Sequence, residues 1–594
     1  MNSNFLRQIS NRSFGIDTRS LAAFRIGLGI LFLCDLCARI QYLIAFHTDD
    51  GIMPRTAIDE LNYTWSFSLL NVFQSSLYHY IFFFVSALIA FSLIIGYRTQ
   101  LSTLLAWIAL ISIQNDNLLV LQVGDTFFRQ LLLFGIFLPL GASYSIDNFL
   151  KDHLHPMYKQ KILTCATVVL ILQICFLYFF AALLQDSTLW WPKFEAVYLS
   201  FQLEQFVTPF GAWFRENIPK VLFKPATAFI YILELMALPL FILPFPIIRF
   251  FTAIALVFTN IILFICMDFG LFPLINIISL FVFIPSFFWD SLTRKIIKRQ
   301  KGTIIYYDAD CLFCFNMVRA LKFILFLPGI PIEEAQKHIN ANRIMENYNS
   351  WVLRTKNKRY LTGFDAIIEV TKLSITFSFT LPLLFLFSVI GVGDKTYKFV
   401  ANNRNRLGPL TKPYFSLRPN SYVTNTPIQL FVLSIILIIG FWNVSNLPGH
   451  QFSFPNYLKP IVYMLRIDQK WAMFNPKPPH YSKWYVMIGQ LRDGTEVDTW
   501  NNTIGNVSFK KPRNVSSNYK TERWRQYLWN LSKQKYKNHQ LNLANYLCLN
   551  WNNGIENESY QLVTHQIYFI EESISVEYRN EPKPTLFFKH HCFK

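Results

Sequence analysis

The chain has 594 residues, of which 53% are hydrophobic and only 15% are charged. Soluble globular proteins carry about 25% charged residues, so this composition excludes a disordered chain, a collagen-like chain and an ordinary cytosolic enzyme. It indicates a membrane protein with attached soluble parts. In such a protein the formal net charge of +19 belongs to loops on the cytoplasmic side of the membrane, and we expect no nucleic-acid partner.

Apolar runs predict about nine membrane-spanning helices, because about 20 apolar residues are needed to cross a bilayer. The first run is longer than the core of a signal peptide and no small-residue cleavage site follows it, so we interpret it as a retained helix. Eight runs form a bundle in residues 1–290, and a ninth lies within 427–445. The predicted spans are 21–46, 77–97, 100–119, 126–140, 162–184, 226–246, 248–267, 270–288 and 428–444.

The distribution of charge predicts the orientation of these spans. With the N-terminus inside, the inner segments carry basic residues such as Arg7 and Lys301, whereas the outer loops carry acidic residues such as Asp49. This arrangement follows the positive-inside rule. We therefore expect a multi-pass protein of a bacterial-type inner membrane, with residues 290–425 in the cytoplasm and residues 446–594 on the far side.

The segment between the eighth and ninth spans has the pattern of a small α/β domain. Short β-rich runs alternate with helical periodicity in the order βαβαββα, which is the order of the thioredoxin core. The predicted strands are 303–307, 330–332, 351–355 and 359–361, and the predicted helices are 315–326, 334–347 and 364–373.

A Cys-x-x-Cys motif follows the first of these strands, with Asp308 just before Cys311 and Cys314. This position places the first thiol at a helix N-terminus, where the helix dipole and free N–H groups favour a thiolate. Cys311 is then the attacking thiol and Cys314 the resolving thiol, although the negative charge of Asp308 opposes a very acidic thiol. Two alternatives stay open. One is a structural zinc site, for which the segment offers only His338 as a further ligand, and the other is a domain that keeps the fold without the activity.

Residues 302–408 resemble the DCC family of thiol-disulfide oxidoreductases, whose name reflects an Asp-x-x-Cys-x-x-Cys pattern. The resemblance implies a thioredoxin-like fold and a catalytic site at the aspartate and the two cysteines. Thioredoxins carry a cis-proline just before the third strand, but the stretch 348–351 has no proline, which counts against substrate recognition through the usual backbone contact. The matching stretches are YYDADCLFC at 306–314, TGFDAI at 362–367 and YKFVANNR at 397–404.

The apolar run 377–390 follows this domain pattern. We expect it to form a helix that lies on the membrane face or against the bundle. A tenth span is the alternative, and it would move residues 446–594 to the inner side of the membrane.

Four stretches of the membrane region carry a resemblance to a known family. They are GIDTRSLAAFRIGLGILFL at 15–33, GYRTQL at 96–101, GDTFFRQLLLFGIFLPLG at 124–141 and the stretch 178–190. Together they resemble the HTTM domain, a bundle related to the vitamin K-dependent γ-carboxylases. The resemblance covers roughly residues 10–290, extends into the C-terminal part, and implies a quinone or an isoprenoid lipid as a ligand of the bundle. No cofactor follows from the residues themselves.

The γ-carboxylases use a lysine as their base, a few residues ahead of a tryptophan. Counting back from Trp190 places Gln185 at the position of that lysine. An amide has no useful basicity, and general base catalysis needs a titratable group within hydrogen-bond reach. We therefore do not expect the carboxylase reaction as that family performs it, unless the adjacent Asp186 has been recruited.

Charged side chains within spans are costly and are candidates for functional sites. Asp35 and Arg39 lie four residues apart on one helix face and are expected to neutralise each other, so structural pairing between helices is the favoured interpretation. The charged residues of the predicted spans are Arg25, Asp35, Arg39, Arg129 and Glu234. The candidates for binding a cofactor are Arg25, Gln185, Trp190 and Glu234.

A second Cys-x-x-Cys motif, Cys34 to Cys37, lies within the first span. One interpretation is a redox relay to a quinone, and the other is a pair of small side chains in the core. The middle of a helix has no free N–H groups to stabilise a thiolate, and burial raises a thiol pKa, so core packing is favoured.

The C-terminal part is predicted to be β-rich, with a hairpin of 485–491 and 497–500 around the turn Asp493-Gly494. Further β runs lie at 567–570 and 573–578, and 523–531 has helical spacing. On the oxidising side of the membrane, Cys548 and Cys592 are able to pair. Trp471, Met473 and Phe474 are expected to pack this part onto the bundle, and His590-His591 to form a frayed tail.

Together these patterns predict a polytopic α-helical membrane bundle with an inserted thioredoxin-like α/β domain and a β-rich C-terminal domain. The favoured function is a membrane thiol-disulfide oxidoreductase, with membrane lipid and an unidentified thiol or protein substrate as partners. Two alternatives are a γ-carboxylase-related enzyme, which Gln185 disfavours, and a membrane scaffold or maturation factor without enzymatic activity.

Overall fold

The computed structural model describes most of the chain and divides it into two compact units. Unit 1 comprises Met1–Leu140, Ile162–Phe283 and Thr424–Lys594, and unit 2 comprises Gly141–Lys161 and Ile284–Val423. Each unit is described by itself below. The described residues are 3–61, 65–73, 75–150, 161–404, 406, 409, 425–449, 451–505, 507–574 and 581–593.

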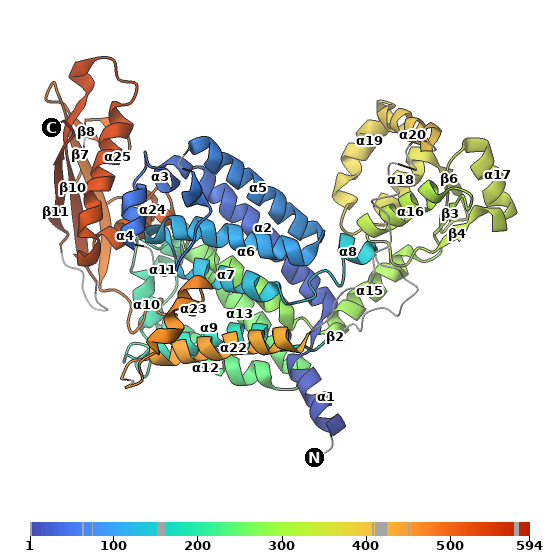
Figure 1. Ribbon diagram of the computed structural model, residues 1–594, viewed down its shortest axis with the longest axis horizontal. Coiled ribbons are helices and arrows are strands. Elements are labelled where there is room, and N and C mark those ends of the chain that lie inside the picture. Colours follow the sequence, from blue (N-terminus) through green and yellow to red (C-terminus); the bar gives the residue numbers. More distant parts are fainter. Residues whose placement is uncertain are drawn as a thin grey trace. The chain divides into compact units, whose positions relative to one another are not determined.

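Long helices form most of unit 1 (Figure 1). The helices α2, α5 and α6 lie side by side, and α9 packs against both α12 and α22. The helices of the bundle are α1 (Ser3–Phe14), α2 (Thr18–Ile40), α3 (Leu43–His47), α4 (Arg55–Leu61), α5 (Ser76–Ile95), α6 (Thr99–Asp116), α7 (Val123–Gly135), α9 (Cys165–Leu184), α10 (Ala196–Phe201), α11 (Pro209–Asn217), α12 (Phe223–Ile242), α13 (Pro246–Cys266), α14 (Phe272–Leu280), α22 (Thr426–Ser445) and α23 (Lys459–Met464).

Six described helices are long and apolar enough to cross a membrane, and the number rises to eight if each of two bent helix pairs is one span. The expected count of nine is therefore not confirmed. Two of the predicted spans fall short for physical reasons: α6 ends in the polar residues 114–116, and α7 has only 13 residues, a length of about 20 Å against a hydrocarbon core of about 30 Å. The six helices are α2, α5, α9, Lys220–Ile242, α13 and α22.

The helix α2 requires glycine at two positions, because side chains of neighbouring helices lie close to its backbone there. A Cβ atom on Gly27 would lie 2.6 Å from the side chain of Ile278, and one on Gly29 would lie 2.5 Å from the side chain of Ile94. The helix begins at an Asp17 cap whose carboxylate accepts a hydrogen bond from the backbone N–H of Arg19, as expected of an aspartate in that position. The two glycines let α2 pack closely against α5 and α14, and most of its residues are buried.

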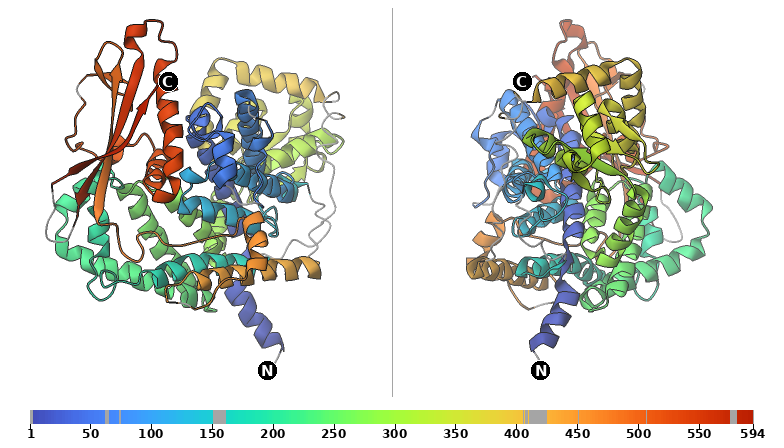
Figure 2. Two further views of the ribbon diagram at one scale, coloured as in Figure 1. Left: turned by 60° about the vertical axis from the view of Figure 1, so that its left-hand side comes forward. Right: turned by 90° about the vertical axis from the view of Figure 1, so that its right-hand side faces the viewer.

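The C-terminal part of unit 1 contains a five-stranded antiparallel sheet with the order β11-β10-β7-β8-β9. The predicted hairpin is confirmed as β7 and β8, whose turn contains Gly494 with a φ of 91°. Figure 2 shows α25 running along the sheet. The elements are β7 (Tyr481–Leu491), β8 (Glu496–Asp498), β9 (Thr503–Ile504), α24 (Glu522–Leu531), α25 (Gln540–Asn552), β10 (Leu562–Ser573) and β11 (Lys583–His591). Residues 575–578 of the predicted run 573–578 lie outside the described residues.

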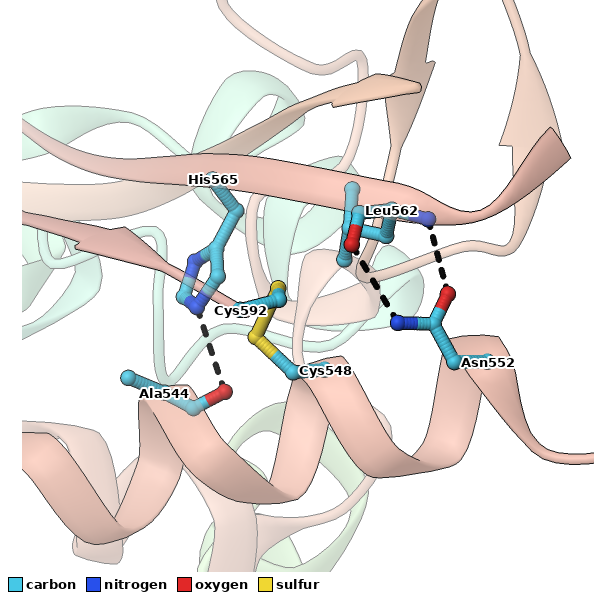
Figure 3. The surroundings of a disulfide bond; sticks show 6 residues. All are labelled: Ala544, Cys548, Asn552, Leu562, His565 and Cys592. Carbon is cyan, nitrogen blue, oxygen red and sulfur yellow. Dashed lines mark hydrogen bonds between the residues drawn. A yellow bond between two sulfur atoms is a disulfide. The ribbon is translucent and has the colours of Figure 1, made fainter. Parts of the chain in front are cut away.

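The expected frayed tail at His590-His591 is wrong, because both residues belong to β11 and pair with β10. The expected pairing of Cys548 with Cys592 is confirmed: a disulfide joins α25 to the residue just after β11 (Figure 3). Nearby, Nε2 of the buried His565 lies 3.2 Å from the carbonyl oxygen of Ala544.

The expected packing of the 471–474 aromatic cluster is also confirmed, since Trp471 is buried in the core of the bundle.

Unit 2 contains a four-stranded sheet with the order β4-β3-β5-β6. β3 is parallel to β4 and antiparallel to β5, and β5 is antiparallel to β6. This order and these directions are the thioredoxin topology that the pattern βαβαββα predicts. The elements are β3 (Ile304–Tyr307), α16 (Leu312–Ile324), β4 (Ile332–Glu334), α17 (Ile339–Tyr348), β5 (Val352–Arg354), β6 (Tyr360–Thr362) and α18 (Gly363–Lys372).

Within its described residues, unit 2 also contains helices outside this thioredoxin-like core. α8 (Ile146–Phe149), which lies far away in the sequence, packs the ring of Phe149 against Phe323 of α16 with their centroids 5.1 Å apart. α15 (Ser286–Gln300) leads into β3. The apolar run 377–390 forms the short helix α19 (Leu381–Val389), which is bent by 85° from α20 (Val392–Asn402).

Candidate active site

Two thiols lie at the N-terminus of α16, which follows directly after the β3 strand and its turn. Cys311 is the N-cap residue, and its sulfur accepts a hydrogen bond from the backbone N–H of Cys314 at 3.3 Å. An N-cap acceptor of this kind satisfies one of the free N–H groups of the helix end, which also favour negative charge. Both cysteines are partly exposed free thiols. The arrangement suits Cys311 to the role of a nucleophile.

The second thiol is held in a different environment. Burial raises the pKa of Cys314 to about 12, and the neighbouring Cys311 adds to the increase, while Arg404 opposes it. Cys314 is therefore a protonated thiol at neutral pH. Such a thiol suits the resolving role, in which it reacts only after the first thiol has formed a mixed disulfide.

Arg404 connects the resolving thiol to Asp308. Its Nη1 atom donates to Sγ of Cys314 at 3.8 Å and lies 3.6 Å from Oδ2 of Asp308. Asp308 also accepts hydrogen bonds from the side chain of Gln336 at 2.9 Å and from the backbone N–H of Asp310 at 3.1 Å. The Asp308 carboxylate is therefore held in place by an arginine and an amide beside the two thiols.

Ser350 lies just before β5, where an ordinary thioredoxin carries its cis-proline, and Tyr397 of α20 contacts it. The hydroxyl groups of Ser350 and Tyr397 are 2.7 Å apart, and the oxygen of Ser350 accepts a hydrogen bond from the backbone N–H of Gly363 at 2.9 Å. Burial raises the pKa of Tyr397, and Cys314 also contributes to this increase. The described residues of unit 2 include no cis peptide bond, so a tyrosine and a serine stand beside the motif instead.

A metal site is the alternative use of these ligands. The ligand atoms of Asp308, Cys311 and Cys314 lie within 4.8 Å of one another, and no further histidine, cysteine or acidic residue joins the group within the described part of the chain. His338 forms a separate pair with Glu333 at 2.8 Å. The guanidinium group of Arg404 adds a positive charge beside the group, which opposes binding of a cation.

A thioredoxin-like domain with a dithiol at the N-terminus of a helix defines the class of thiol-disulfide exchange proteins. In agreement with this, residues 305–409 match the family of DCC1-like thiol-disulfide oxidoreductases. The match covers nearly all of the expected 302–408 segment and does not extend to the membrane region, so the HTTM resemblance stays a prediction. No curated protein and no solved structure matches the chain.

Unit 1 contains a separate cavity of about 420 Å³ among α9, α12, α13 and α14. Its lining is mostly apolar and includes three of the four predicted cofactor-binding residues. Nε2 of Gln185 donates to Oε2 of Glu234 at 2.8 Å, and Trp190 lines the same cavity. The fourth residue, Arg25, is elsewhere: its guanidinium group donates to the backbone carbonyls of Leu140 and Ile94.

Several residues that line this cavity have a polar atom without a hydrogen-bond partner within the described part of the chain. These residues are less than a tenth exposed, and a buried polar atom without a partner is costly. The atoms are Oε1 of Gln185, Nε1 of Trp190, Nε1 of Trp471 and Oδ1 of Asn276. The wall of this mostly apolar space, which has the size of a small-molecule site, therefore includes residues with unpaired donors and acceptors.

The second Cys-x-x-Cys motif shows no sign of a redox site. Cys34 and Cys37 are both exposed on α2 and are not bonded to each other, so their expected packing in the core is wrong. Both side chains face outward from the helix bundle.

Sequence reasoning also missed two residues of the site in unit 2, Arg404 and Tyr397. Both belong to the stretch 397–404, which the family resemblance marks without giving the residues a role.

Proposed function

We propose that the protein is a membrane-bound thiol-disulfide oxidoreductase that uses Cys311 as the nucleophile and Cys314 as the resolving thiol. The observation that carries this proposal is the N-cap position of Cys311 on α16, three residues before a second, partly buried thiol, in a domain with thioredoxin topology. The thiolate of Cys311 attacks a disulfide of the substrate and releases one thiol. Cys314 then attacks the mixed disulfide, releases the second thiol and leaves the protein oxidised.

The redox state of the dithiol in cells tests this function. Thiols are trapped with acid and labelled with a membrane-permeant alkylating mass tag, in full-length protein that lacks the other five free cysteines and keeps Cys548–Cys592. We expect a mixture of reduced and oxidised dithiol that shifts on treatment with oxidant. A dithiol that stays fully reduced under every condition, or a Cys311→Ser/Cys314→Ser variant with a wild-type phenotype, would favour a scaffold without enzymatic activity.

The proposed orientation places unit 2 in the cytoplasm and the C-terminal sheet on the far side of an inner membrane. The Cys548–Cys592 disulfide supports the second half of this statement, because disulfides persist in oxidising compartments. α19 would lie on the membrane face, since it contains no charged residue and is too short, at nine residues, to span a bilayer. The substrate thiol would then be cytoplasmic or at the inner membrane surface.

A second proposed function is binding of a quinone or an isoprenoid-like lipid in the cavity of unit 1. The observation that favours it is the apolar lining with Gln185, Glu234 and Trp190 on the wall. Donors and acceptors of these three residues would hold the polar ring, and the aromatic and aliphatic side chains would cover the tail. A carboxylase reaction has less support, because Gln185 donates to Glu234 and no lysine is among the described residues of the lining.

Photolabelling tests the second function. Full-length protein in vesicles is irradiated with a photoreactive short-chain benzoquinone, and the labelled peptides are mapped. We expect label on α9 and α12, and its loss in Ala181→Trp, which fills the cavity, but not in Ile30→Trp, whose site is exposed on α2. Label that is equal in both variants and in the wild-type protein would contradict the site.

A further inference from the structure

The geometry points to Arg404 as the residue that activates Cys314 for the second step of the exchange, and to Asp308 as the residue that positions Arg404. This inference rests on the proposed thiol-disulfide exchange and adds a role that the two cysteines alone do not supply. It begins from a chemical problem. Partial burial keeps the thiol of Cys314 protonated and therefore unreactive, yet Cys314 must become a thiolate to resolve the mixed disulfide.

Few charged groups are close enough to act on this sulfur. Among the described residues, Arg404 is the cation that contacts it, with Nη1 3.8 Å from Sγ, and the guanidinium group remains protonated in proteins. Cys311, the N-cap residue of α16, carries no charge once it is part of the mixed disulfide. Tyr397 approaches from α20, and burial raises the pKa of its hydroxyl group, which keeps it neutral. Asp308 opposes a thiolate, but its charge is compensated by the arginine.

The second step then balances as follows. The thiol of Cys314 gives its proton to solvent water at the partly exposed edge of the site, and the guanidinium group of Arg404 stabilises the resulting thiolate. The thiolate sulfur bonds to Sγ of Cys311, the bond from Cys311 to the substrate sulfur breaks, and the substrate leaves as a thiolate that takes up a proton. The substrate disulfide has gained two electrons, and the two cysteines of the protein have lost them.

The Asp-x-x-Cys-x-x-Cys motif suggests that Asp308 takes part in catalysis directly, but its contacts indicate that it acts through Arg404. Its carboxylate lies 3.6 Å from Arg404 and is fixed from the other side by Gln336 at 2.9 Å. Held in this way, it orients the long arginine side chain toward the sulfur. Asp308 is thus a positioning residue, and its effect on the reaction should disappear once Arg404 is removed.

The two steps can be separated with Ellman's reagent, an aromatic disulfide that releases one coloured thiolate in each step. Reduced full-length protein in detergent, without the other five free cysteines, is mixed with the reagent and absorbance is followed in a stopped-flow instrument. The first equivalent reports attack by Cys311 and the second reports resolution by Cys314. Cys314→Ser should release only the first equivalent.

We expect Arg404→Gln to leave the first phase within about twofold of its normal rate, because Arg404 contacts Cys314 and not Cys311. We expect the second phase to slow about tenfold, or about 1.4 kcal/mol, because the thiolate of Cys314 loses a charge-assisted hydrogen bond. The pH profile of the second phase should move to higher pH. Arg404→Lys should restore part of the rate. Arg406→Gln, an exposed arginine two residues away, is the matched control and should change neither phase.

Asp308→Asn should slow the second phase in the wild-type background but not in the Arg404→Gln background, which is the signature of a residue that acts through another. A second phase of normal rate and normal pH profile in Arg404→Gln would overturn the inference while leaving the proposed function intact. A first phase that survives in Cys311→Ser would instead contradict the proposed function. The two failures are therefore distinguishable.

Discussion

At the scale of single residues, four buried charges form a neutral cluster in unit 1. Arg39 lies 2.8 Å from both Asp35 and Asp125, and Arg523 of α24 lies 2.6 Å from Asp35 and 3.2 Å from Asp125. Burial alone would lower the pKa of Arg523, but the two carboxylates outweigh this effect and raise the pKa above its ordinary value. The cluster joins α2 and α7 of the bundle to the C-terminal part of the unit.

Removing one member of the cluster should be strongly destabilising. Arg523→Met leaves two buried carboxylates beside a single arginine, and breaking a buried ion pair costs about 3–5 kcal/mol. We expect a large decrease in the melting temperature of the protein in detergent. The double variant Arg523→Met/Asp35→Asn restores neutrality and should recover part of that loss. A double variant that is as unstable as the sum of the single variants would show that charge balance is not the cause.

The same cluster predicts how stability depends on pH. Burial alone would raise the pKa of Asp125, but the charges of Arg523 and Arg39 lower it below its ordinary value of about 3.8. A carboxyl group with a lowered pKa in the folded state contributes stability above its unfolded pKa and loses it as pH falls through the folded pKa. We expect this contribution to be constant from pH 7 to pH 5 and to disappear below about pH 4. Thermal melts of wild-type protein and Arg523→Met across that range measure the difference.

In both the buried charge cluster and the dithiol site, the sequence predicts only those residues that are close to each other along the chain. The Asp35–Arg39 pair follows from the spacing of four residues on one helix, and the structure confirms it. Arg523 is 488 residues from Asp35, and Arg404 is 90 residues from Cys314. Neither partner leaves a periodic or spacing signal, because both contacts depend on how distant elements pack.

At the scale of elements, α19 is unusual in exposing most of its apolar side chains. Val389 is 85% exposed and Phe379, just before the helix, is 75% exposed. Lys372, Lys395 and Lys398 lie close to it in the sequence, and Lys372 approaches the ring of Phe385. An apolar surface bordered by lysines fits the boundary of a bilayer with anionic lipids.

A lipid-soluble photoreactive carbene reagent checks the proposed contact of α19 with the membrane. In full-length protein reconstituted in vesicles we expect label on α19 and on α22. Leu386→Glu should reduce the label on α19 several-fold, because a charge opposes entry into the bilayer. Ile339→Glu alters an equally apolar exposed residue on α17 and should have no effect. Label on α22 without label on α19 would contradict the contact.

Elements that depend on local periodicity were predictable, and elements that depend on a partner were not. The strands and helices of unit 2 follow the alternation of the sequence, and the sheet order confirms the predicted topology. β11 was missed because the stretch 583–591 lacks a strong β pattern. It becomes a strand because β10 offers an edge of free hydrogen-bonding groups, and because the Cys548–Cys592 disulfide holds its end to α25.

At the scale of the whole molecule, the chain returns to unit 1 after an insertion. Residues 284–423 form most of unit 2, and the bundle is completed only by α22. The insertion was predictable from the loss of long apolar runs. The participation of residues 141–161 in unit 2 was not, because that segment precedes the insertion by more than a hundred residues and has no pattern of its own.

The orientation of this molecule can be tested with two introduced cysteines in a background that lacks the seven free thiols and keeps the disulfide. Tyr457→Cys lies beyond α22 and Ile339→Cys lies on α17, and both wild-type side chains are highly exposed. In intact spheroplasts we expect a membrane-impermeant maleimide to label the cysteine at position 457 at once and the one at 339 only after permeabilisation. A tenth span would instead place position 457 inside. Protection of both cysteines until permeabilisation would therefore favour that alternative, and it would leave Cys548–Cys592 in a reducing compartment, where disulfides rarely persist.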